Sequence, residues 1–435
     1  MSQVVREIRV PPDPVGIARA LAGAAHATDG LAVLHGDGRG ALGPADARFS
    51  FVACAPVETS DAWVPPAGRT PKTVDTHGWA GFGAAPRWIG VIPYEATRAL
   101  ERPAWTRAPD DRAPPSLLIP RWQRYDAVVR IDRASGAVVL EADDASAAAR
   151  LEGKLRAPWP LARPVTLCPK AREPDSAHVA RIREILRLIA KGDVYQVNAA
   201  RRIGFTVSGS PLDVFSRLFK ASPAPYGFFA DFHDVTVCAT SPELALEVRG
   251  DRLRTAPIKG TRPRGPDAAS DAALARELDA DTKERAELTM AVDLHRNDLG
   301  RVAVPGSVRV LGVPRVLGGR TVWSRVAEVV ARRAPDTDLE AILRAVLPCG
   351  SVTGAPKVRA MEIIATLEPF RRGLYTGAFG YLGRDGALVL AMAIRTLEIQ
   401  GDIAQYWTGG GIVADSDPLR ELEETHWKAV QLASL

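Results

Sequence analysis

Two pairs of glutamates are the first candidates for chemistry in this sequence. Glu284 and Glu287 lie within KERAEL, and Glu421 and Glu424 lie within ELEETHWK, which also contains Lys428. On a helix, residues three or four positions apart share one face. Two such faces that meet across a cleft would offer Mg²⁺ the oxygen ligands that it prefers. The alternative is a pair of solvated helix faces, because the ExxE pattern is common in proteins.

A second group of residues could carry out proton transfer and nucleophilic attack. Glu243 follows an expected strand in the sequence Ser-Pro-Glu, and Lys259 lies in the segment PIKGTRPRG. Desolvation raises the pKa of a carboxyl group, so a buried Glu243 could act as a general acid. A desolvated lysine amine can act as a nucleophile, which is the hypothesis for Lys259. The alternative is a strand-end carboxylate and a surface lysine.

Two glycine-rich segments could bring backbone N–H groups close to an anion. CGSVTGAPK contains Thr353 and Gly354 and precedes an expected helix, whose N-terminus would favour negative charge. Gly409, Gly410 and Gly411 follow an expected strand and would allow a ligand to approach the backbone closely. The first segment is not a Walker A loop, because its lysine does not follow the second glycine directly. An ordinary loop-to-helix turn and a flexible connection are the alternatives.

The composition is that of a globular protein, with 46% hydrophobic and 25% charged residues in a chain of 435. The net charge of +5 comes from scattered basic residues, which does not favour nucleic-acid binding. No apolar run reaches the roughly 20 residues of a membrane helix, and the N-terminal sequence lacks a signal layout. We therefore expect a cytoplasmic protein that does not bind membranes. The four cysteines form no CxxC pair, which indicates neither a disulfide framework nor a zinc site.

The first part of the chain is irregular, and we predict a separate N-terminal subdomain over residues 1–170. Residues 127–131 and 137–141 flank a Ser-Gly turn and predict a hairpin. Residues 143–156 are rich in alanine and predict a short helix. A catalytic domain is expected over residues 171–435.

Helices and strands follow each other more regularly in that second part. A helix is expected from Ser176 to Gly192, and a strand over 195–207. A long helical stretch is expected over about 267–298, and a last helix should begin near Asp417-Pro418. Because the order shows no regular βαβ period, the predicted fold class is α+β.

One hairpin is expected near the C-terminus, in the sequence GAFGYLG–RDG–ALVLAMAIRTLEI. Asp385-Gly386 lies at its centre, and this residue pair suits a type I′ turn. The whole run after the turn is expected to form one strand.

Nine motifs in one order resemble those of the chorismate-utilising enzyme family. They are GDVYQVN, SPE, PIKGTRPRG, KERAEL–VDLHRNDLGR, GSVTGAPKVRAMEII, YTGAFGY, IRT, GGGIVADSDP and ELEETHWKA. The resemblance covers about residues 176–431 and is loose before them. The family includes anthranilate synthase component I, aminodeoxychorismate synthase component I, isochorismate synthase and salicylate synthase. It implies large antiparallel sheets packed as a sandwich with helices outside.

The resemblance also implies roles for the candidate residues. Glu287 and Glu424 would ligate Mg²⁺ directly, with Glu284 and Glu421 assisting through water, and the metal would bind the ring carboxylate of chorismate. Glu243 would protonate the departing ring hydroxyl. The residues that the resemblance assigns to the substrate are Gln196, Thr353, Gly354, Tyr375, Arg395, Gly410, Gly411 and Lys428.

These substrate residues divide between the two carboxylates of chorismate. The glycine N–H groups and the ammonium of Lys428 would hold the ring carboxylate. Arg395 and Tyr375 would bind the enolpyruvyl carboxylate, a task that suits the forked guanidinium group.

Two positions select among the reactions of the family. Isochorismate and salicylate synthases resemble one another in having a water-activating lysine at the position where this chain has Gln196. Glutamine cannot act as that base, so Gln196 disfavours hydroxylation. Anthranilate synthases typically have PIAGT where this chain has PIKGT, so Lys259 resembles the nucleophile of aminodeoxychorismate synthases. We therefore predict an aminodeoxychorismate synthase component I, which takes ammonia from a separate glutamine amidotransferase subunit. Anthranilate synthase component I and a non-catalytic, chorismate-binding regulatory paralogue are the alternatives.

Two departures from the family pattern bear on that choice. Ser324 stands where the family usually has a histidine linked to pyruvate release, and a serine cannot carry a proton near neutral pH. Gly227 stands where the NPSPYM-like segment, tied to tryptophan binding, has methionine. We expect an enzyme that keeps the enolpyruvyl group and is not regulated by tryptophan.

Overall fold

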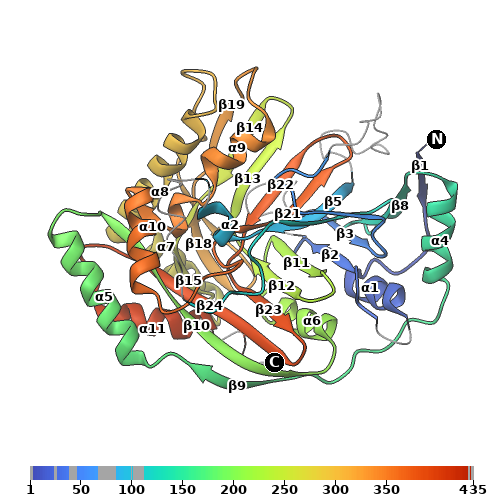
Figure 1. Cartoon of the computed structure of the whole chain (residues 1–435), viewed down its shortest axis with the longest axis horizontal. Helices are drawn as coiled ribbons and strands as arrows, with labels where there is room; N and C mark the ends of the chain where they lie inside the picture. The colour runs from blue at the N-terminus through green and yellow to red at the C-terminus, as the bar shows by residue number, and fades with distance from the viewer. Residues whose placement is uncertain are drawn as a thin grey trace.

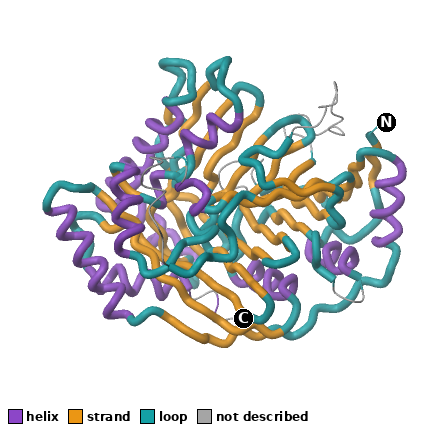
Figure 2. The backbone as a smooth tube through the Cα atoms, viewed as in Figure 1, coloured by secondary structure: helices purple, strands orange, loops and turns teal. Residues whose placement is uncertain are grey.

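The protein consists of large antiparallel sheets with helices at their outer faces (Figures 1 and 2), as seen in a computed structural model of the chain. The structure describes residues 3–23, 27–38, 47–66, 85–98, 100, 112–429 and 432. The α+β fold class and the sandwich of antiparallel sheets are therefore confirmed. Among the described helices, none combines the length and the apolar character that a membrane span requires.

The largest sheet has twelve strands, eleven of which follow one another along one path. In spatial order these are β1 (Val4–Glu7), β8 (Val138–Ala142), β7 (Ala127–Asp132), β3 (Phe49–Ala53), β2 (Ala32–His35), β11 (Tyr226–Asp231), β12 (Thr236–Ser241), β23 (Thr396–Gln400), β24 (Ile403–Ile412), β10 (Gln196–Ser208) and β20 (Gly354–Ala355). The twelfth strand, β9 (Thr166–Arg172), pairs with β10. The long pair of β10 and β24 brings the glycine triplet to one end of this sheet.

A second antiparallel sheet has nine strands. Their order is β16 (Arg309–Val310), β19 (Val329–Arg332), β14 (Arg252–Ala256), β13 (Leu244–Arg249), β22 (Leu388–Met392), β21 (Ala378–Gly383), β5 (Pro86–Ile92), β6 (Arg121–Arg124) and β4 (Glu58–Ser60). A third sheet consists of β15 (Ile258–Pro263), β18 (Val322–Val326) and β17 (Arg315–Gly318). Both large sheets combine strands from either side of residue 170, and the boundary proposed there stays a prediction.

Apolar side chains from the facing sides of the two large sheets form a common core. Phe228 of β11 and Phe379 of β21 lie with their ring centroids 4.7 Å apart inside this core. Burial of such large side chains is the main favourable contribution to folding, roughly 2 kcal/mol for each. The core therefore joins the two sheets rigidly and fixes the positions of the strand ends.

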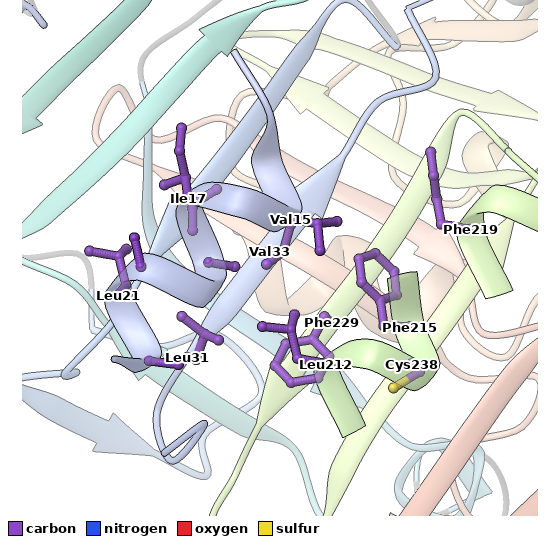
Figure 3. Close-up of a cluster of buried hydrophobic side chains, with 14 of the residues drawn as sticks. Val15, Ile17, Leu21, Leu31, Val33, Leu212, Phe215, Phe219, Phe229 and Cys238 are labelled. Atoms are coloured by element: carbon purple, nitrogen blue, oxygen red, sulfur yellow. The ribbon is translucent and has the colours of Figure 1, made fainter. Parts of the chain in front are cut away.

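The helices cover the outer faces of the sheets. They are α1 (Pro14–Ala22), α2 (Tyr94–Arg98), α4 (Ala145–Leu155), α5 (Asp175–Ala190), α6 (Pro211–Ala221), α7 (Ala268–Ala280), α8 (Thr282–Gly300), α9 (Leu339–Val346), α10 (Lys357–Leu367) and α11 (Pro418–Ala429), with a 3₁₀ turn η1 (Gly350–Val352). Helices α1 and α6 pack against the large sheet, where Ile17 of α1, Phe215 of α6 and Phe229 of β11 belong to one buried cluster (Figure 3). At the other end of the molecule, α5, α8, α10 and α11 lie together (Figure 1).

Most of the expected elements are confirmed. The structure has the hairpin of β7 and β8, the helix α4 after it, the helix α5 from Asp175, the long strand β10, and α11 with Pro418 as its first residue. These elements have local signals, which are amphipathic spacing, capping residues and Pro at a helix start.

The single long helix expected over about 267–298 is wrong. The chain forms α7 and α8 with a break at Asp281, whose backbone is extended (φ −64°, ψ 114°). The Asp281 carboxylate accepts a hydrogen bond from the Glu284 N–H and so caps α8. Aspartate is a favourable N-cap residue, and the new helix start turns α8 independently of α7.

The C-terminal hairpin differs from expectation in two ways. Strands β21 and β22 pair as predicted, but only Gly386 of the turn has a positive φ (81°), whereas a type I′ turn requires two such residues. The run after the turn is also not one strand. It leaves the second sheet after Met392, crosses at 393–395, and enters the first sheet as β23.

Candidate active site

Two segments of the chain pass from one large sheet to the other. These crossings lie side by side, and each carries one candidate residue. Glu243 lies between β12 and β13, and Arg395 lies between β22 and β23. Backbone hydrogen bonds join the crossings, from Met392 N–H to the Glu243 carbonyl (3.0 Å) and from Thr240 N–H to the Arg395 carbonyl (3.1 Å). Arg395 has a positive φ of 51°. Such a conformation is unfavourable for a residue with a side chain, and strain of this kind is concentrated at functional sites.

Glu243 has the environment of a general acid. Its side chain is buried, with 4% of the residue exposed, and the Ser351 hydroxyl donates a hydrogen bond to Glu243 Oε1 (2.9 Å). Burial raises the pKa of Glu243 to about 7, against the opposing effects of Lys259, Ser351 and Lys428. Near neutral pH, Glu243 is therefore partly protonated, and a carboxyl group in that state can deliver a proton.

Lys259 approaches the same serine from another strand. Gly260, with φ 75°, shifts the register between β15 and β18, so the pairing is irregular next to Lys259. The Lys259 ammonium donates a hydrogen bond to the Ser351 carbonyl (3.2 Å). The 3₁₀ turn η1 thus connects the candidate acid to the candidate nucleophile. Sequence analysis did not predict this role of Ser351, which is one residue of a glycine-rich motif.

Gln196 and the last glycine of the triplet line the space around Lys259. A Cβ atom at Gly411 would lie 2.5 Å from Gln196 Nε2 and 3.5 Å from Lys259 Nζ. Within the described part of the chain, Gln196 Nε2 is buried and has no hydrogen-bond partner. A buried amide without a partner is unfavourable, so this N–H group is available to a ligand. The sequence placed these three residues in separate motifs, and the structure brings them together.

The middle glycine of the triplet faces α11. A Cβ atom at Gly410 would lie 3.1 Å from Glu421 Oε2 and 3.8 Å from Glu424 Oε2. Glu421 Oε1 accepts a hydrogen bond from the Ser416 hydroxyl (2.7 Å). Glu421 Oε2 has no hydrogen-bond partner among the described residues, although the side chain is only 7% exposed. The carboxylates of α11 therefore lie against the glycine backbone, and one buried oxygen is free to bind a cation.

The glutamates of α8 lie close to those of α11. The Lys283 ammonium is 3.8 Å from Glu287 Oε1 on its own helix and 3.7 Å from Glu421 Oε1 on α11. Burial raises the pKa of Glu284, Glu287 and Glu421, and the charge of a neighbouring glutamate raises each of these pKa values further. The structure thus places all four predicted carboxylates in one electrostatically coupled group.

Lys428 behaves differently from Lys283. Its ammonium donates a hydrogen bond to the Gly409 carbonyl (2.7 Å) and forms an ion pair with Glu424 Oε1 (2.6 Å). The charge of Lys428 is the main reason why the pKa of Glu424 is lowered. A fixed ammonium beside the glycine triplet could bind a carboxylate of the substrate.

Tyr375 provides a polar group beside the first glycine of the triplet, and Arg395 lies directly before β23, which pairs with β24, the strand that carries the triplet. A Cβ atom at Gly409 would lie 3.0 Å from the Tyr375 hydroxyl, and the Tyr375 ring stacks on Trp407 (centroids 6.4 Å apart). Burial lowers the pKa of Arg395, and no carboxylate of the described residues pairs with its guanidinium group. An uncompensated guanidinium in a half-buried position is suited to binding an anionic ligand.

Thr353 and Gly354 hold the loop that carries Ser351. The Thr353 hydroxyl donates a hydrogen bond to the Cys349 carbonyl (2.9 Å), and the residue is fully buried. A Cβ atom at Gly354 would lie 2.1 Å from the Gln196 carbonyl oxygen, so only glycine permits β20 to pair with β10 here. A contact of either residue with substrate stays a prediction.

The four glutamate carboxylates provide the kind of donor atoms that a hard divalent cation binds. Carboxylate oxygens are the ligands that Mg²⁺ prefers, and the buried Glu421 Oε2 has no other partner in the described part of the chain. No three acidic, histidine or cysteine side chains of the described residues already converge on one metal position. The lysines between and beside the glutamates compensate part of their charge instead. The magnesium site therefore stays a prediction that the donor set supports.

A separate cavity of about 70 Å³ lies between the two large sheets. Tyr226 and Gly227 line it together with Phe49, Phe51 and Phe379, and none of the candidate catalytic residues does so. A Cβ atom at Gly227 would lie 2.5 Å from the Phe219 ring, so a larger residue would require rearrangement. The expected lack of tryptophan regulation stays a prediction.

The sequence profile described as chorismate binding enzyme matches residues 56–434 of this chain. The chain belongs to this family. Its sequence is 37% identical to that of the anthranilate synthase component 1 of Streptomyces coelicolor, over 88% of this chain and 80% of that protein. It is also 37% identical to the aminodeoxychorismate synthase of Streptomyces griseus, over 81% of this chain and 50% of that protein.

A solved structure supports the same assignment. The chorismate binding enzyme resembles anthranilate synthase component I from Streptococcus pneumoniae with a TM-score of 0.74 and 30% identity, covering 89% of this chain and 92% of the other. The relatives thus have two different names, and the family membership does not decide between their products.

Proposed function

We propose that this chorismate binding enzyme is an aminodeoxychorismate synthase component I, which converts chorismate and ammonia to 4-amino-4-deoxychorismate with Mg²⁺. The observation that carries the proposal is the position of Lys259. Its amine shares Ser351 with the candidate acid Glu243 and lies next to Gly411 and Gln196. A primary amine in this position offers a nucleophile beside a proton donor.

The proposed reaction begins with attack by the Lys259 amine, in its neutral form, on ring carbon 2 of chorismate. A bond forms between Nζ and carbon 2, the two conjugated ring double bonds both shift by one position, and the bond from carbon 4 to its hydroxyl breaks. Glu243 transfers its proton to the departing oxygen, so the leaving group is water. The reverse displacement follows, in which ammonia bonds to carbon 4 and the Lys259 amine leaves carbon 2. The enolpyruvyl group stays on the ring.

The four glutamate carboxylates would hold the metal. Glu287 and Glu424 would be direct ligands, and Glu284 and Glu421 would act through water. When bound, Mg²⁺ supplies a positive charge that withdraws electrons from the ring carboxylate and so favours attack on the ring. Lys428, which is already held at the Gly409 carbonyl, would orient the same carboxylate.

Gln196 disfavours the hydroxylation that other members of the family carry out. Its amide cannot remove a proton from water, whereas its buried N–H group can donate a hydrogen bond to the substrate. The ammonia would come from a separate glutamine amidotransferase subunit, in keeping with relatives that are named as components.

A product assay tests the proposal. The purified chain is incubated with chorismate, an ammonium salt and Mg²⁺, and the products are separated by chromatography. We expect 4-amino-4-deoxychorismate, and fluorescent anthranilate as the product would refute the proposal. The Lys259→Ala variant should make far less product and should still bind Mg²⁺.

Anthranilate synthase component I is the second candidate. It is favoured by the names of the S. coelicolor relative and the S. pneumoniae structure. A regulatory paralogue would instead bind chorismate in calorimetry and form neither product. The same preparation of protein therefore separates all three functions.

A further inference from the structure

Lys283 connects the two helices that carry the candidate metal ligands. It is the second residue of α8, directly before Glu284. Its ammonium lies between two carboxylates, 3.8 Å from Glu287 Oε1 and 3.7 Å from Glu421 Oε1 on α11. One positive charge therefore lies between the glutamates of α8 and those of α11.

The contacts of Lys283 are much looser than those of Lys428. Lys428 makes contacts of 2.6 and 2.7 Å to Glu424 and the Gly409 carbonyl. Both distances from Lys283 exceed the hydrogen-bond range, and its side chain is 48% exposed. Lys428 is thus held in place, whereas Lys283 can move into solvent without breaking a hydrogen bond.

We propose that Lys283 acts as a displaceable internal cation, which compensates Glu287 and Glu421 in the metal-free protein and moves aside when a divalent cation binds. This inference rests on the magnesium site of the proposed function. It adds a residue that competes with the metal and so sets its affinity.

The arrangement of charges supports this role. Four glutamates from α8 and α11 lie in one group, and like charges on facing helices repel each other unless a cation lies between them. Among the described residues, no three acidic side chains converge on one point. The Lys283 ammonium lies between two of these carboxylates instead, at distances typical of an ion pair without direct hydrogen bonds.

A lysine suits such a role better than an arginine. Its ammonium is compact and strongly hydrated on a flexible chain, so it returns to water at little cost. A guanidinium group would bind carboxylates through two parallel hydrogen bonds and would resist displacement.

The test is calorimetric titration of the full-length chain with MgCl₂ alone, in the absence of chorismate. Lys283→Met removes the charge and keeps most of the aliphatic chain. We expect it to bind Mg²⁺ about two- to fivefold more tightly than the wild type, since exposed ion pairs contribute energies of that size. Lys283→Arg should bind Mg²⁺ more weakly than the wild type. Lys220→Met, on the exposed face of α6, is the matched control for loss of one charge and should leave the affinity unchanged.

Thermal unfolding of the same proteins provides a second measurement. Without metal, Lys283→Met should unfold at a lower temperature than the wild type, and Mg²⁺ should raise its unfolding temperature by more. Unchanged or weaker Mg²⁺ binding by folded Lys283→Met, beside normal binding by the wild type, would overturn the displacement and leave the metal site intact. Absence of Mg²⁺ binding in every variant would overturn both the displacement and the proposed metal site.

Discussion

The candidate site has two regions that differ in burial and in charge. In the acid–amine region, Glu243 and Lys259 are joined through Ser351, and the carboxyl group is almost completely buried. In the carboxylate region, four glutamates from two helices lie beside two lysines, Lys283 and Lys428, and the side chains of Glu424 and Lys283 are about half exposed. The first region is held together by hydrogen bonds, and the second mainly by charge.

This difference shows how one fold provides two kinds of electrostatic environment. A proton donor requires a carboxyl group that keeps part of its protonated form near neutral pH, and burial between the sheets achieves this for Glu243. In the carboxylate region Lys428 lowers the pKa of Glu424 and favours its charged form. Burial raises the pKa values of Glu284, Glu287 and Glu421, an effect that a bound cation would oppose. Variants of each region should therefore fail in different ways.

The largest effect is expected from Glu243→Gln. The amide has nearly the same shape and can still accept the Ser351 hydrogen bond, but it cannot transfer a proton. We expect kcat to fall by about 10²- to 10⁴-fold, measured as formation of amino product from chorismate. Binding of Mg²⁺ should stay normal, and a decrease in kcat of less than tenfold would show that Glu243 is not the acid.

The corresponding change in the carboxylate region is Glu424→Gln. Loss of one charged ligand should weaken Mg²⁺ binding by about tenfold or more, measured by calorimetry without substrate. Glu423→Gln is the matched control, because Glu423 is the exposed neighbour on the same helix. Equal Mg²⁺ affinity of the two variants would mean that the metal site lies elsewhere.

The pH dependence of activity should depend on the acid–amine region. Since Glu243 is active when protonated and has a pKa of about 7, kcat/KM of the wild type relative to that of Glu243→Gln should fall as the pH rises through about 7, and this ratio removes the effect of Lys259, which must be neutral in both proteins. The decrease should approach tenfold for each pH unit above that value. The residual activity of Glu243→Gln should lack this decrease, and an unchanged profile in that variant would assign the titration to another group.

The smallest effect is expected from Ser351→Ala. The Ser351 hydroxyl lowers the pKa of Glu243 by donating a hydrogen bond to its carboxylate form. Removing the hydroxyl should therefore raise the pKa and move the decrease in kcat/KM to higher pH, by less than about one unit. The contact of Lys259 to the Ser351 backbone carbonyl should persist. A shift toward lower pH would contradict the described hydrogen bond.

Much of the fold could be predicted because its signals are local. The spacing of apolar residues indicated α5, and Asp417-Pro418 indicated the start of α11. The break at Asp281 was missed because residues 279–287 contain neither glycine nor proline, and only the cap of α8 reveals it. The crossing at 393–395 was missed because an apolar run leads into it, whereas the Arg395 carbonyl accepts a hydrogen bond from the distant Thr240 N–H.

The sequence predicted which residues belong to the candidate site, but it did not predict which of them contact one another. The resemblance of nine motifs indicated Glu243, Lys259 and the four glutamates, and the structure places them in two adjoining regions. Ser351 and Lys283 were missed, because neither residue has a chemical signature of its own. Their roles depend on partners that are far away in the sequence.

The amino-acid sequence by itself determined which functional groups are present and which local elements carry them. It provided the amine of Lys259, the carboxyl group of Glu243, two glutamate pairs at helical spacing and a glycine triplet on a strand. The tertiary structure alone decided the state of these groups. Desolvation and Coulomb interactions depend on depth and distance, and those are set by how the two large sheets and the helices α8 and α11 pack together.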